Sequence, residues 1–269
     1  MLKAEAGACS GAEVALHPRV NPGSANLNGQ LGNGASYNAR LTGEGGRLNL
    51  FWLLAPPENP NKLEVLRRYL ENKGIDLNER DLMIDSLLDW VEPNTGLHRL
   101  NAPPESDTYH PAHAMLTGVD ELKQVAGWAE FTSTPGWDDD FTVNRYTNAI
   151  DMQWVSRDAL LALPGLTPEI VDRFLQLRDG RDGITGTADD MQFKSVVDFQ
   201  RTLGPGVAHV LQQLHDDLGL ITFGNVNVYR VVSVGKTGNA TRTVQIVFQK
   251  SNTGGVVGGG PTVISWKEF

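Results

Sequence analysis

Two patterns of hydrophobic and polar positions divide the chain. Between residues 57 and 218, apolar residues recur every three or four positions, which is typical of amphipathic helices. After Gly219 apolar and polar residues alternate, which is typical of strands with one buried face. We expect helices at 63–70, 82–91, 120–125, 156–163, 167–178, 195–203 and 207–218, and strands at 225–234, 241–250 and 262–267.

The residues before this block predict a helix, a loop and a hairpin. Residues 1–17 are rich in alanine and read as a short helix that His17-Pro18 ends, with its Leu2, Val14 and Leu16 against a sheet or a partner helix. Residues 20–36, rich in Asn, Gly and Ser, predict a loop. Weak strand patterns at 36–41 and 47–51 flank Gly-Glu-Gly-Gly, which favours a hairpin.

Strands at both ends of the chain with helices between them indicate one α+β domain that carries a helical insertion. We place the first part of the α+β domain at 1–56, the helical insertion at 57–219 and the closing strands at 220–269. For the helix at 82–91 we expect Asn78 or Asp81 as the N-cap, after a helix-ending Gly74.

Composition narrows the function. The chain has 269 residues, 40% of them hydrophobic and 20% charged, as in a water-soluble globular protein, and it contains no run of about 20 apolar residues. Its net charge is −9 and its basic residues are scattered, so we expect no nucleic-acid partner. The single cysteine, Cys9, excludes an internal disulfide framework.

The stretch DGRDGITGTADD, residues 179–190, is the strongest candidate for a binding site. It holds four carboxylates and three glycines in twelve residues. Glycines allow the backbone to turn back on itself, and crowded carboxylates need either solvent or a cation. We predict calcium, with the five ligand residues Asp179, Asp182, Thr187, Asp189 and Asp190. The loop is not an EF-hand, and a solvated acidic turn is the alternative.

Other candidates are weaker. His110 and His113 form the one close histidine pair, with no obvious third ligand, so a loop feature is favoured over a metal site. Asp85 and Asp89 share a helix face, which a solvated surface explains. Trp137-Asp138-Asp139-Asp140 is a second calcium candidate or a plain acidic turn.

Known motifs of catalysis and DNA binding do not fit this chain. Residues 161–180 are similar to a helix-hairpin-helix element, but Thr167 replaces its second glycine and Pro168 has no N–H to offer a phosphate. The sequence contains no nucleophile elbow, P-loop or dinucleotide fingerprint. We therefore expect no enzymatic activity, since even a hydrolase with a calcium-shaped site would need a nucleophile or a base.

Several segments, taken in order, resemble the K-type minor pseudopilin of bacterial type II secretion (general secretion pathway protein K). The matching residues are AEAG at 4–7, GEGGRLNL at 43–50, DSLLDWVEP at 85–93, the stretch 141–180, and the closing NVYRVVSVG, TRTVQIVFQ and VISWKE. The family's leader and the apolar first half of its N-terminal helix are not in this sequence. We therefore interpret the chain as a soluble periplasmic fragment.

The resemblance implies a pilin-like fold, an N-terminal helix on an antiparallel sheet, interrupted by a large all-helical domain that binds calcium. It also implies a structural subunit at the tip of the periplasmic pseudopilus, with I- and J-type minor pseudopilins as partners and secreted proteins as possible substrates. Membrane contact would come only through the missing N-terminal helix, at the periplasmic face of the inner membrane. The alternative is a calcium-binding interaction domain of another envelope assembly, such as a type IV pilus.

Overall fold

The structure is a computed structural model that describes residues 1–32, 34–224, 227–250 and 260–269. Internal contacts divide the chain into two compact units. We call them the sheet unit (Met1–Gly45, Phe174–Lys194 and Gly224–Phe269) and the helical unit (Gly46–Arg173 and Ser195–Phe223). Residues 251–259, between the strands expected at 241–250 and 262–267, and residues 225–226 of the strand expected at 225–234 lie outside the described residues.

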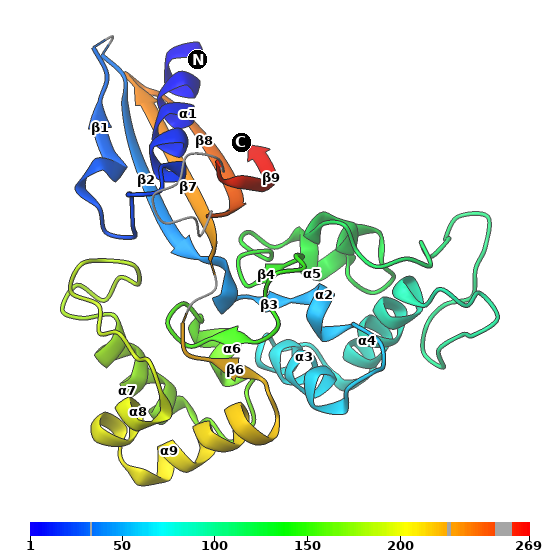
Figure 1. Ribbon diagram of the computed structural model, residues 1–269. Coiled ribbons are helices and arrows are strands. Elements are labelled where there is room, and N and C mark those ends of the chain that lie inside the picture. The colour runs from blue at the N-terminus through cyan, green and yellow to red at the C-terminus, as the bar shows by residue number, and fades with distance from the viewer. Residues whose placement is uncertain (33, 225–226, 251–259) are drawn as a thin grey trace. The chain divides into compact units, whose positions relative to one another are not determined.

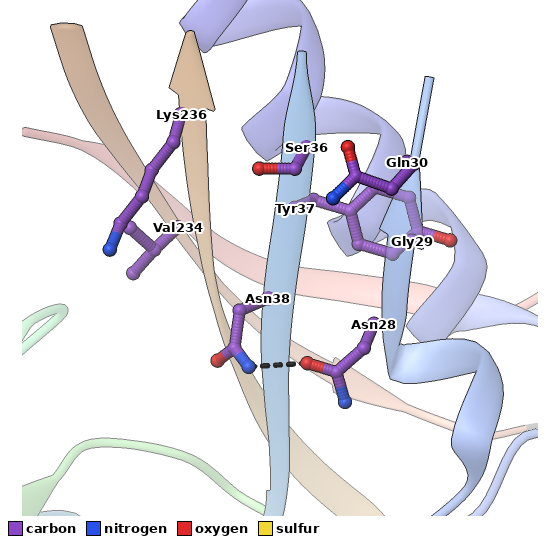
Figure 2. Close-up of a pocket in the computed structure, with 8 residues that line it drawn as sticks. All are labelled: Asn28, Gly29, Gln30, Ser36, Tyr37, Asn38, Val234 and Lys236. Atoms are coloured by element: carbon purple, nitrogen blue, oxygen red, sulfur yellow. Dashed lines mark hydrogen bonds between the residues drawn. The ribbon is translucent and has the colours of Figure 1, made fainter. Parts of the chain in front are cut away.

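The sheet unit is an N-terminal helix on an antiparallel sheet, which confirms the expected fold class (Figure 1). The sheet has five strands in the order β1-β2-β7-β8-β9. Its elements are α1 (Leu2–Leu16), β1 (Asn28–Gln30), β2 (Ser36–Gly43), β7 (Val228–Thr237), β8 (Ala240–Gln249) and β9 (Thr262–Glu268), with a 3₁₀ turn at Ala25–Leu27. The 3₁₀ turn and β1 lie in the segment that the sequence predicted to be loop throughout.

Small residues let α1 approach the sheet closely. The alanines at 4, 8, 12 and 15 are fully buried, and a Cβ atom added to Gly235 of β7 would lie 1.9 Å from the Ala4 carbonyl oxygen. Val14 and Leu16 are partly buried against the core, but Leu2 is 81% exposed, so its expected burial is wrong. The helix packs through its alanines and glycines, and Leu2 lies in its first turn, beyond this contact.

The expected hairpin of 36–41 with 47–51 is also wrong. β2 pairs instead with β7, from Ser36↔Lys236 to Gly43↔Tyr229, and residues Glu44–Gly46 form a 3₁₀ turn. Glu44 is fully buried there, and its carboxylate accepts two hydrogen bonds from the guanidinium of Arg230, at 2.9 and 2.7 Å. A buried carboxylate needs such a partner, and this ion pair holds Glu44 beside β7 instead of in a hairpin turn.

The helical unit contains most of the helices and two short pairs of parallel strands, β3 with β4 and β5 with β6. Its elements in order are β3 (Leu48–Asn49), α2 (Leu50–Leu53), α3 (Pro60–Asn72), α4 (Leu77–Val91), η3 (Val119–Gln124), α5 (Ala129–Ser133), β4 (Phe141–Thr142), β5 (Ile150–Asp151), α6 (Arg157–Leu161), α7 (Pro168–Arg178, whose last residues belong to the sheet unit), α8 (Val196–Leu203), α9 (Pro205–Gln212), η4 (Gln213–Asp217) and β6 (Ile221–Thr222).

Two local predictions in this unit need correction. The N-cap of α4 is Asp76, whose side chain accepts hydrogen bonds from the backbone N–H groups of Asn78 and Glu79. Asn78 and Asp81 lie inside the helix, because α4 begins five residues earlier than its apolar pattern. The segment at 120–125 is a 3₁₀ helix rather than an α-helix.

An aromatic cluster and a polar network hold the helical unit together. The Trp128 indole is fully buried, donates its N–H to the Met83 carbonyl at 2.9 Å, and meets Phe131 and Phe141 edge to face. The Tyr69 hydroxyl donates to Asp140 at 2.8 Å. Asp140, one of the second set of calcium candidates, is thereby engaged inside the protein.

The units differ from the sequence-based division in two places. The helical unit begins at Gly46 rather than at residue 57, and residues 174–194, with the acidic loop, group with the sheet unit. One contact explains the second difference: the Arg40 guanidinium of β2 donates to the Thr185 carbonyl at 3.1 Å. It joins residues 145 positions apart, which helical periodicity does not reveal.

Gly235→Ala tests the close packing of α1. The new methyl group would collide with backbone atoms, so we expect a loss of about 2–3 kcal/mol in the free energy of unfolding, measured by urea denaturation. Gly32→Ala in the same unit is the control, because no atom lies within 4 Å of the added methyl group. Equal effects of the two substitutions would contradict this account of the packing.

Candidate functional site

The acidic loop is closed at its base by a buried ion pair. Arg178, at the end of α7, is 2% exposed, and its Nε donates to Asp179 Oδ1 at 2.8 Å. The Thr185 hydroxyl donates to the same carboxylate oxygen at 3.0 Å and accepts from Arg178 Nη2 at 3.0 Å. The backbone N–H of Met191 donates to the Arg178 carbonyl at 2.9 Å, so both ends of the loop meet here.

This arrangement gives Asp179 a structural partner. A buried guanidinium without a counterion is strongly destabilising, and Asp179 supplies that counterion from the adjacent position. Both of its carboxylate oxygens accept hydrogen bonds from Arg178, and one also accepts from Thr185. Among the five predicted calcium ligands, Asp179 is therefore distinguished by its ion pair with a buried guanidinium.

Three other predicted ligands, Thr187, Asp189 and Asp190, come together elsewhere in the loop. The Thr187 hydroxyl lies 2.8 Å from Asp189 Oδ1 and 3.2 Å from Asp190 Oδ1, and its proton is shared between them. The backbone N–H of Arg181 donates to Asp189 Oδ2, and that of Gly186 donates to Asp190 Oδ2. The Thr187 hydroxyl and the Arg181 N–H lower the pKa of Asp189, because both donate to the charged carboxylate.

Glycines make this fold of the loop possible. Gly180, Gly183 and Gly186 all have positive φ angles, between 65° and 93°. A Cβ atom on Gly180 would lie 2.4 Å from Asp189 Oδ2, so the backbone at 180 passes directly beneath that carboxylate. The last predicted ligand, Asp182, is exposed and accepts from the backbone N–H of Ile184 at 2.8 Å, which stabilises its own turn.

The donor chemistry of the loop suits a hard cation, since Thr187, Asp189 and Asp190 offer oxygen atoms alone. Within the described residues, however, no three His, Cys, Asp or Glu side chains are grouped so that they could hold a metal ion. The structure therefore gathers part of the predicted ligand set, and calcium stays a prediction.

The other sequence candidates have different surroundings from those we expected. Asp89 is 3% exposed rather than solvated, and its Oδ1 accepts from the Arg99 backbone N–H. Asp85 accepts from the backbone and side chain of Asn101, so the two aspartates anchor the segment after α4. Sequence reasoning also missed Arg178 and Thr185. The Arg-Asp pair at 178–179, at the end of a predicted helix, was the available signal.

Comparisons with known proteins show the fold. No protein-family model and no curated protein matches the sequence. A chain of the crystal structure of the GspK-GspI-GspJ complex from the enterotoxigenic Escherichia coli type 2 secretion system is similar in structure, with a TM-score of 0.64 and 14% sequence identity. The similarity covers 100% of this chain and 94% of that chain, so it includes both units.

Alanine substitutions at Asp179 and Asp182 separate the structural carboxylate from the exposed one. In excess chelator we expect Asp179→Ala to cost about 3–5 kcal/mol of unfolding free energy, because the buried Arg178 loses its counterion. Asp182→Ala should cost less than about 1 kcal/mol, as is usual for an exposed side chain. Urea denaturation measures both, and equal costs would show that Asp179 has no special role at the loop base.

Proposed function

We propose that this chain is the periplasmic part of a K-type minor pseudopilin, a non-enzymatic structural subunit of type II secretion. The observation that carries the proposal is the structural similarity over the whole chain to a protein from that system's pseudopilin complex. The similarity includes the helical unit as well as the pilin-like sheet. It therefore concerns a pilin-like sheet that carries a helical insertion, and not merely a sheet that many proteins share.

The place of the insertion supports the same function. The chain leaves the sheet after β2 and enters the helical unit, and it returns to the sheet at β7. β2 and β7 are hydrogen-bonded neighbours. GEGGRLNL at 43–50, a segment that resembles the family, contains the first of these crossings, at Gly45–Gly46. NVYRVVSVG at 227–235, which also resembles the family, follows the last crossing, at Phe223–Gly224. A pilin sheet opened at this point can carry a large extra unit without losing its strand order.

In our proposal, the size of the helical unit places the protein at the tip of the pseudopilus. A subunit that carries so large an insertion would block the stacking of another subunit above it, and would therefore end the filament. Its partners would be the I- and J-type minor pseudopilins, the other two proteins of the similar complex. We place the protein at the periplasmic face of the inner membrane, held by an apolar N-terminal helix of the kind that the family carries. Among the described helices none is long and apolar enough to cross a membrane.

Calcium is part of the proposal. Asp182, Thr187, Asp189 and Asp190 would supply oxygen ligands, while Asp179 would keep the loop base closed through Arg178. A bound cation would neutralise the neighbouring carboxylates of Asp189 and Asp190. Because Arg40 of β2 binds the loop at Thr185, the ion would stabilise the sheet unit to which the loop belongs.

Assembly with heterologous partners tests the proposed function. We expect the chain to be monomeric alone and to form a one-to-one-to-one complex with soluble cognate I- and J-type domains, measured by light scattering after size exclusion. Ala6→Arg, on the exposed side of α1, should weaken the complex if the N-terminal helices pack together, whereas Thr241→Arg at an exposed strand position should not. A tight homo-oligomer, or binding only to type IV minor pilins, would contradict the proposal.

Calcium addition to metal-free protein tests the loop. We expect a rise in melting temperature that corresponds to about 2.7 kcal/mol when the ion is at a hundred times its dissociation constant. Asp190→Asn should abolish this rise, and Glu130→Gln at an exposed position of α5 should preserve it. An unchanged melting curve on calcium addition would leave the solvated acidic turn as the correct interpretation.

A further inference from the structure

The segment between α4 and η3 contains three of the six histidines of the chain, His98, His110 and His113. Within residues 92–118 the structure describes no helix or strand, only an isolated bridge between Ser106 and Tyr109. Long irregular segments inside a compact unit are uncommon and are often functional. In this segment the side chains of the three histidines contact carboxylates.

His113 lies between two hydrogen-bond acceptors. Its Nδ1 is 2.9 Å from the carbonyl oxygen of Glu92, and its Nε2 is 3.0 Å from Glu105 Oε1. A carbonyl oxygen can only accept, and so can an ionised carboxylate. A neutral imidazole has one N–H and can satisfy one of them, whereas the imidazolium satisfies both. The geometry at His113 is therefore that of the protonated ring.

The backbone at His113 supports a specific role for this side chain. Its φ angle is +49°, and it is the one non-glycine residue with positive φ in the part of the chain that the structure describes. That conformation is uncommon for residues with a Cβ atom, although histidine is among those enriched there. It directs the ring between α4, which ends next to Glu92, and Glu105 in the irregular segment.

The same carboxylate faces a second histidine. Glu105 Oε2 lies 3.6 Å from His110 Nδ1. The third histidine, His98, lies 3.4 Å from Asp89 Oδ1 on α4. Asp89 also adds its negative charge to the surroundings of His113. Arg99 of this segment also forms an ion pair with Glu58.

Both ends of the segment form walls of an apolar pocket of about 180 Å³. Leu54, Leu88 and Val91 line the pocket from the helices, while the segment contributes residues on either side of the histidine contacts, Pro93, Arg99, Ala114 and Met115. Release of His113 would free the backbone directly next to Ala114 and Met115. The histidine contacts are thus placed to control the shape of this pocket.

We propose that Glu105, His110 and His113 form a proton-operated clasp that fastens residues 92–115 to the end of α4 and so sets the walls of the apolar pocket. The clasp is closed when His113 carries both protons and loosens when it loses one. This is a regulatory property of the helical unit and does not depend on the partners or the metal proposed above.

The direction of the pH effect follows from the contacts. The hydrogen bond that the His113 ring donates to Glu105, and then the one that it donates to the Glu92 carbonyl, raise the pKa of His113 above its ordinary value of 6.5. Their stabilisation is complete below that value and is lost as the pH rises through the higher pKa of the folded protein. The histidines lower the pKa of Glu105 below 4.5, so on the acid side the clasp holds until the pH falls through that lowered value.

Histidine titration by NMR, combined with hydrogen exchange of residues 92–115, tests the clasp. At about pH 5.5 the segment should exchange about two- to fivefold more slowly than at about pH 8, after correction for intrinsic rates, as expected for exposed ion pairs. Glu105→Gln should abolish this pH dependence and return the His113 midpoint to the ordinary range. Asp216→Asn, which breaks the His215–Asp216 contact in the same unit, should change neither property.

His113→Asn supplies a second variant that keeps the fold, because asparagine tolerates the positive φ angle. It should also lose the pH dependence of exchange. Exchange that is equally pH-dependent in the wild type and in both clasp variants would overturn the proposal. Slow exchange that requires added zinc, and not protons, would overturn it as well and would identify a metal site instead.

Discussion

The buried ion pair between Glu44 and Arg230 holds the sheet unit together at the point where the helical unit is inserted in the sequence. Glu44 directly follows β2, the strand from which the chain leaves the sheet, and Arg230 lies near the start of β7, the strand by which it returns, 186 positions later in the sequence. The two residues are 0% and 5% exposed. Neither charge could stay buried alone, so each fixes the position of the other.

This pair explains how a sheet can accept so large an insertion. β2 and β7 are neighbours joined by strand hydrogen bonds, although most of the helical unit lies between them in the sequence. The guanidinium of Arg230 donates to both carboxylate oxygens of Glu44. This bidentate geometry fixes the relative orientation of the two side chains in addition to their charge attraction. It holds the ends of the two strands in register where the inserted chain begins and ends.

The same principle recurs in the acidic loop and in the segment after α4. Arg178 is a permanent cation that assigns Asp179 to the loop base and leaves Asp189 and Asp190 near the surface. His113 is a conditional cation that assigns Glu105 to a contact only while it is protonated. Permanent charge therefore supports the fold, and titratable charge makes one segment responsive to pH.

The sequence by itself determined most of the helices and the three long C-terminal strands, because their hydrophobic periodicity is a local property. It also placed the glycines that the acidic loop needs. Only the tertiary structure decided that β2 pairs with β7, that Asp89 is buried, and that Asp179 serves Arg178. These outcomes depend on residues far apart in the chain or on competition among several donors for one carboxylate, and a pattern along the sequence records neither.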